Sequence, residues 1–196
     1  MWAADGLIQP SYGITTNMMI LIDEAMSNKK QNHLSDKYNN YKMKFGITYD
    51  GGQSKEPYLQ ILLDDEEEID DTLLNYVDHL AHNLCFKRER GISPLKYPLK
   101  ITCSPEALGA LKPKKLLLYG VVSFLDDAIF EHCSQLELLH IGASNAPLFS
   151  TPPTNLMKCP LKFLNLNGYG LVLEGESMPI LEQHIKSIGG QVCRYY

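Results

Sequence analysis

The residues best suited to chemistry are potential metal ligands that lie close together in the sequence: Asp78, His79, His82 and Cys85. Two histidines three positions apart on a helix can bind zinc when a third ligand arrives from elsewhere in the fold. No second group of ligands at a suitable spacing occurs in the sequence. We therefore expect no metal site here but a partly exposed helix flank, with zinc binding as the alternative.

An acidic run leads into these residues, since every position from Asp64 to Asp71 is acidic except Ile69. Apolar residues then recur at helical spacing and predict a helix over residues 72–86; they are Ile69, Leu73, Val77, Leu80 and Leu84. The helix dipole favours acidic side chains at a helix N-terminus. Consecutive acids on a helix point in different directions, so capping is a better interpretation of the run than metal binding.

Catalytic motifs are missing from the sequence. It contains no GxSxG, HExxH, P-loop or GxGxxG pattern, and His132, His140 and His184 fall on different predicted elements. We therefore expect a protein that is not an enzyme and that has no cofactor and no small-molecule substrate.

The charge balance argues against nucleic acid as a partner. The net charge is -5, and the arginines, whose forked guanidinium suits phosphate, are Arg88, Arg90 and Arg194. No apolar run is long enough to cross a membrane, and no signal peptide is visible. The 5 cysteines include no CxxC pair and favour reduced, buried thiols. We expect a cytoplasmic or nuclear protein in a reducing compartment.

The N-terminal half predicts an α+β region that caps the rest of the chain, over residues 1–94. Residues 41–49 alternate partly, as a half-buried strand does, and residues 58–63 form a second strand candidate. Asp50, Gly51 and Gly52 between them predict a turn, so the two strands are expected to form a hairpin. The first 60 residues show little other pattern.

Similar apolar phrases recur from about residue 95 to the C-terminus. Their central residues are Leu116, Leu139, Leu164 and Val192, at intervals of roughly 23 to 28 residues, with a possible first turn at 95–101. Each phrase predicts a short strand that points its leucines into a core, followed by a return segment that lets the next strand pair in parallel.

The return segments differ in sequence. Residues 124–133 predict a helix on the convex side, and residues 145–160 contain prolines that prevent a full helix. Residues 177–188 predict the last helix, which ends at Gly189 and has four apolar residues expected to face inward: Ile180, Leu181, Ile185 and Ile188.

Two copies carry a family resemblance. Residues 125–141 read as a helix ending in Cys133, followed by the pattern CxxLxxLxL, and residues 159–166 repeat this pattern from Cys159 with one residue deleted. They resemble the cysteine-containing subtype of leucine-rich repeat, known from F-box substrate receptors of ubiquitin ligases and from a small mitochondrial ATP-synthase-associated factor. The resemblance implies that both cysteines are buried structural residues. No F-box pattern is found in residues 1–90.

The expected fold is therefore α/β: a short leucine-rich-repeat solenoid over residues 95–196, with parallel strands and convex helices. Residues between the inward leucines should line up in rows on the concave face, and a third row would hold Tyr119, Gly142 and Asn167. The residues expected to bind a protein partner are Lys115, Leu117, Tyr119, Leu138, His140, Phe163 and Asn165.

Two functions fit these expectations. One is a non-enzymatic scaffold or adaptor, such as a ubiquitin-ligase substrate receptor, and the other is a structural subunit of a permanent multiprotein complex, which could be mitochondrial. Whether the concave face is exposed or covered by the chain itself stays open at this point, because a short solenoid can hide this face under its own N-terminal segment.

Overall fold

A single seven-stranded sheet runs through the computed structural model, which describes residues 44–49, 56–64, 67–75, 77, 82–88, 98–122, 124–142, 148–167 and 177–195. The strands lie across the sheet in chain order, from β1 to β7. β1 (Lys44–Tyr49) pairs antiparallel with β2 (Pro57–Leu63), which confirms the predicted hairpin, although its turn lies outside the described residues. All further pairs are parallel, so β2 to β7 form a six-stranded parallel sheet.

The later strands lie where the repeated phrases predict them. β4 is Lys115–Tyr119, β5 is Leu138–Ile141, β6 is Phe163–Asn167 and β7 is Gln191–Tyr195. Leu116, Leu139, Leu164 and Val192 are neighbours in register across these four strands. The chain from β2 onward is therefore an α/β structure in which each strand pairs with the next one along the sequence.

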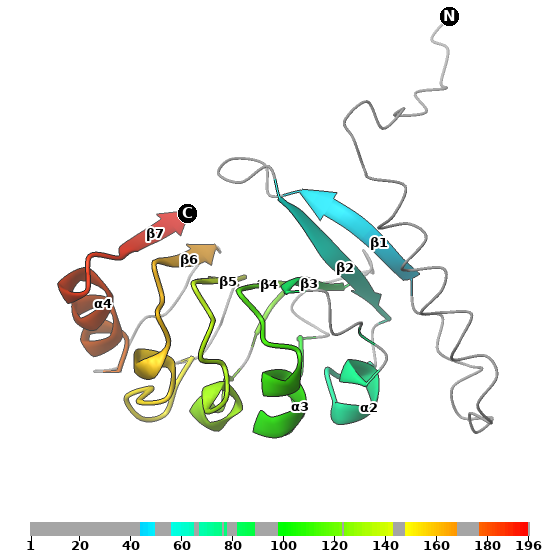
Figure 1. Ribbon diagram of the computed structural model, residues 1–196, viewed down its shortest axis with the longest axis horizontal. Helices are drawn as coiled ribbons and strands as arrows, with labels where there is room; N and C mark the ends of the chain where they lie inside the picture. The colour runs from blue at the N-terminus through cyan, green and yellow to red at the C-terminus, as the bar shows by residue number, and fades with distance from the viewer. Residues whose placement is uncertain are drawn as a thin grey trace, which may run out of the picture. The chain divides into compact units, whose positions relative to one another are not determined.

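Short helical segments connect the strands: α2 (Asp71–Leu74), α3 (Pro105–Ala110), the 3-10 helices η1 (Asp127–Phe130) and η2 (Leu156–Lys158), and α4 (Ser177–Ser187). Figure 1 shows α2, α3 and α4 in a row along one side of the strands. The core lies between this row and the sheet, because the strand leucines and the inner helix residues are buried together, with Leu139, Leu164, Leu181 and Ile185 each 0% exposed.

Aspartates join successive connecting segments. Asp71 in α2 accepts a hydrogen bond at 2.5 Å from the main-chain N–H of Ser104, the residue that caps α3. Asp127 in η1 accepts at 2.7 Å from Asn155 N–H and at 3.0 Å from Leu156 N–H, at the start of η2. An anionic acceptor at a helix N-terminus satisfies N–H groups that have no partner inside the helix. These bonds fix one connecting segment against the next.

Two glycines allow the coils to approach closely. A Cβ atom at Gly109 would lie 2.3 Å from His132 Cβ, and one at Gly142 would lie 2.1 Å from Gly120 O. No side chain fits at these distances, so both positions require glycine for the present spacing of the coils.

The helix predicted over residues 72–86 is wrong in its second half. Residues 83–88 form β3 (Asn83–Arg88), the strand between β2 and β4, and the parallel sheet therefore begins before residue 95. Leu84, Cys85 and Phe86 are all buried, at 0%, 1% and 1% exposed. Strands covered on both faces read as continuous apolar runs, and a short run of this kind also fits helical spacing.

Three smaller predictions also need correction. The helix expected over 124–133 is the short η1, and the possible strand at 95–101 is reduced, in its described part, to single bridges at Leu99 and Ile101. Helix α4 is confirmed, but Ile180 is 40% exposed and Ile188 is 50% exposed. Adjacent helix residues point about 100° apart, so Ile180 and Leu181 cannot both face the core. Ile188 lies beyond the end of the helix.

Candidate functional site

The predicted binding residues lie on one face of β4, β5 and β6, which we call the candidate face: Lys115, Leu117, Tyr119, Leu138, His140, Phe163 and Asn165. Two of the predicted rows are confirmed in register. Lys115 is the neighbour of Leu138, which is the neighbour of Phe163, and Leu117, His140 and Asn165 align in the same way.

The third predicted row is not formed as a ladder in the described strands. The pairing of β4 with β5 ends at Leu118 and Ile141, one residue before Tyr119 and Gly142. Asn167 pairs with Tyr195 of β7, and Tyr119 pairs with Lys87 of β3. Tyr119 therefore joins the face from its edge.

Burial divides the candidate face into two classes. Leu117, Leu138, His140 and Asn165 are buried, at 1%, 5%, 7% and 6% exposed. Lys115, Tyr119 and Phe163 are partly exposed. The centre of the face is therefore covered, and the accessible surface lies in the side chains around it.

An apolar cluster explains part of this burial. Tyr58 of β2, Cys85 of β3, Leu117 and Leu138 pack together as buried residues, and Tyr119 and Phe163 pack against them from outside. Sequence reasoning missed Tyr58 and Cys85 as members of this face. Cys85 was hidden by the wrong helix prediction, and no sequence signal aligns a strand with the repeats when it lies outside their period.

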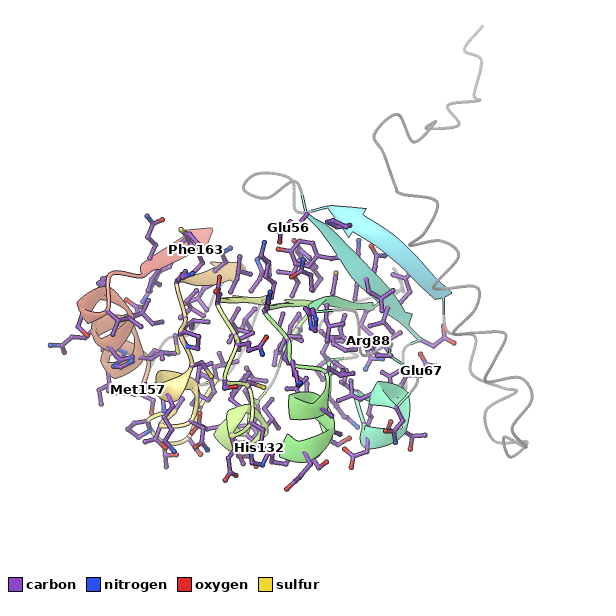
Figure 2. All side chains as sticks on the ribbon, viewed as in Figure 1. Glu56, Glu67, Arg88, His132, Met157 and Phe163 are labelled. Atoms are coloured by element: carbon purple, nitrogen blue, oxygen red, sulfur yellow. The ribbon has the colours of Figure 1, made fainter. Side chains whose placement is uncertain are left out.

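A polar network borders the cluster at the N-terminal ends of the strands. Lys115 Nζ lies 2.8 Å from Glu56 Oε2 and 5.9 Å from the centre of the Tyr58 ring. Asn83 Nδ2 donates to Glu56 Oε2 at 3.4 Å and to Pro57 O at 3.2 Å. The hydrogen bond and charge of Lys115 lower the pKa of Glu56. Figure 2 shows Glu56 and Phe163 on the side of the sheet away from the helices, and His132 and Met157 on the helix side.

The buried polar residues of the face differ in their surroundings. The Tyr119 and His140 rings lie 4.6 Å apart between centres and are tilted by 42°. Asn165 Oδ1 is a buried acceptor with no hydrogen-bond donor among the described residues. Burying an amide oxygen without a donor costs free energy, so packing alone does not explain an asparagine at this position.

The possible metal ligands are only partly described. His82 precedes β3, with Nδ1 3.3 Å from Leu111 O, and Cys85 is buried in the sheet; Asp78 and His79 lie outside the described residues. Within the described ranges, no three His, Cys, Asp or Glu side chains form a group that could hold a metal ion. Of the acidic run, Asp70 caps α2 by accepting from Leu73 N–H at 2.7 Å.

Cys133 and Cys159 are buried, at 0% and 4% exposed, as the repeat resemblance implies for these positions. Burial raises the pKa of Cys133 to about 12 and that of Cys159 to about 11. Cys103 is buried in the same way, with a pKa of about 12. The thiolate is the reactive form of cysteine, so these thiols are unreactive at neutral pH.

Comparisons with known proteins found no matching family model, no matching curated protein and no matching solved structure. In the parts of the chain that the structure describes, no helix has the length and apolar character needed to cross a membrane.

Proposed function

We propose that this chain is a non-enzymatic protein-binding scaffold and that it binds its partner through the candidate face. The observation that carries the proposal is the aligned face of β4, β5 and β6, where Tyr119 and Phe163 remain partly exposed against the buried Leu117 and Leu138. Protein interfaces are enriched in aromatic residues that anchor on a packed apolar centre within a polar rim. Lys115, Glu56 and Asn83 supply such a rim.

The proposed architecture is a short leucine-rich-repeat solenoid. Several features support it: consecutive strands pair in parallel, the connecting helices lie on one side, and Cys133 and Cys159 are buried shortly after η1 and η2. In a solenoid, each coil contacts its neighbours and leaves the strand face for binding. An adaptor of this architecture, such as a substrate receptor of a ubiquitin ligase in the cytoplasm or nucleus, is the specific form that we propose.

A second candidate function is a structural subunit of a permanent complex, such as a mitochondrial assembly. It is favoured by the exposure of large apolar side chains outside the candidate face: Phe124 at 49%, Ile180 at 40% and Ile188 at 50%. Apolar residues at this level of exposure are suited to burial against other subunits, because permanent interfaces are more apolar than transient ones.

Affinity purification with mass spectrometry tests the first proposal. The bait is the full chain, compared with a Tyr119→Ala/Phe163→Ala double variant that removes both accessible aromatics of the face. Phe124→Ala is the matched control, because it removes an exposed aromatic elsewhere. We expect a protein that co-purifies with the parent and the control and is lost from the double variant. The same set of proteins on all three baits would contradict the proposal.

Gel filtration of a gentle cell extract separates the two functions. A permanent subunit elutes with a large assembly and leaves almost no free chain, since obligate partners do not exist apart. A scaffold with exchangeable partners shows a free pool at 22.1 kDa beside the larger species. A ubiquitin-ligase receptor would in addition recover an adaptor subunit of the ligase.

A further inference from the structure

The last strand of the sheet presents an open edge. β7 is the final strand in the sheet order and has β6 as its only described neighbour. Gln191 N–H donates to Lys162 O at 2.7 Å, toward β6. Main-chain groups alternate in direction along a strand, so the next residue, Val192, turns its N–H and C=O away from β6. An outward main chain of this kind is a template for pairing with another strand.

Natural edge strands are protected by lysine, proline, a bulge or an inward charge. The sequence of β7, Gln191–Tyr195, has no lysine and no proline, and it pairs with β6 at every position without a bulge. Its charge, on Arg194, is held by an ion pair with Glu182 of α4. The edge therefore lacks the features that prevent strand addition.

We propose that β7 pairs antiparallel with β7 of a second copy of this chain, about a two-fold axis beside Cys193. In this register Val192 of each copy lies opposite Arg194 of the other, and Gln191 lies opposite Tyr195. No charge faces its own copy, and each Arg194 already has Glu182 as its counter-ion. The two five-residue strands overlap over their whole length, so the two sheets become continuous.

The same coil supplies apolar surface for such a contact. Ile180 and Ile188 belong to α4 and to the turn before β7, and with Phe124 they are the large apolar side chains that stand out as exposed among the described residues. A pair of short strands alone buries less surface than a stable interface needs. We therefore expect a weak dimer, with a dissociation constant on the order of 10 µM.

A second copy fits this edge better than head-to-tail assembly. The other edge of the sheet is β1, which runs antiparallel to its neighbour. Joining β7 to β1 of another copy would leave free edges and build an open filament, whereas the two-fold contact closes after two copies. A foreign peptide that adds to β7 is the alternative occupant, and it would leave the purified chain monomeric.

Sedimentation equilibrium of the full chain tests the proposal, with concentrations below and above the expected constant. The mass should rise from 22.1 kDa toward twice that value. Val192→Pro removes an N–H that points away from β6, so it should weaken the dimer by about tenfold or more and leave the melting temperature unchanged. Gln191→Pro is the matched control: it removes the N–H that bonds to Lys162 and should lower the melting temperature.

Cross-linking gives a readout that does not depend on the proline variants. Paired antiparallel residues have Cα atoms about 4.5 to 5.5 Å apart, within the range that a disulfide spans. Copper–phenanthroline oxidation should therefore link Cys193 to Cys193 of the second copy in the parent and not in Cys193→Ser; the other cysteines are buried. A parent that stays monomeric at every concentration, or cross-links that survive Cys193→Ser, would overturn the proposal.

Discussion

The two faces of the same strands are both buried, yet they differ in chemistry. On the helix side, the aligned positions Leu84, Leu116, Leu139 and Leu164 are all leucine and 0% to 2% exposed. On the candidate face, the next aligned row is Cys85, Leu117, His140 and Asn165, at 1% to 7% exposed. Packing into a core explains the uniform row. It does not explain buried polar groups in the varied row, which lose hydration on burial.

The largest effect is expected from a charge in the uniform row. Leu139→Asp should unfold the protein, because burying an unpaired carboxylate and losing the leucine together cost about 5 kcal/mol or more. Circular dichroism melting measures this effect. Gln135→Asp places the same charge at an exposed position of the same coil and should melt like the parent. If Leu139→Asp also melts like the parent, the two faces have been assigned in the wrong register.

A smaller effect is expected when an aromatic of the candidate face is shortened. Phe163→Ala should destabilise the protein by about 1 to 2 kcal/mol, less than the 3 to 5 kcal/mol typical of a buried phenylalanine. Phe130→Ala is the matched comparison, because Phe130 is 1% exposed under the sheet. Chemical denaturation of both variants measures the difference. Equal losses would show that Phe163 belongs to a closed core and is not an accessible anchor.

The varied row should respond to an apolar residue in the opposite direction. Asn165→Leu should raise the free energy of unfolding by about 1 kcal/mol, because it removes a buried oxygen without a donor. Leu164→Asn, one position away in the uniform row, should lower it by about 3 kcal/mol. Denaturant titration compares the two. A clear loss of stability in Asn165→Leu would mean that the asparagine supports the fold.

The smallest effect concerns Glu67, a buried acid outside both rows. Burial raises its pKa, and the hydrogen bond from Asp64 N–H at 2.6 Å lowers it in part. Because the folded pKa is above the unfolded one, the native state holds more protons between the two values, and stability falls as pH rises through them. Glu67→Gln should therefore raise the melting temperature at pH 7 by about 1 to 3 °C, and the gain should vanish below about pH 4.

Melting curves across this pH range measure the gain. Glu131→Gln removes one charge from an exposed position and should give no comparable difference. A gain for Glu67→Gln that stays constant down to low pH would show that the buried carboxyl is not its cause.

The sequence predicted the uniform row better than the varied one, for a physical reason. Leucines at a fixed period located β4, β5 and β6 and their register, because packing demands the same residue type in each coil. β3 was mistaken for helix, because its consecutive buried residues fit both periods. The covering of Leu117 by the cluster with Tyr58 was not predictable, since it depends on a strand outside the repeats.

Hydroxyl-radical footprinting tests the central claim most directly, that the candidate face is the side that binds a partner. It compares the modification of side chains in the free chain with that in the assembly isolated from cells. The account predicts that Tyr119 and Phe163 become protected in the assembly, while Phe124, exposed elsewhere at 49%, keeps its reactivity. Protection of Phe124 with unchanged Tyr119 and Phe163, or a chain that is recovered only in the free form, would contradict it.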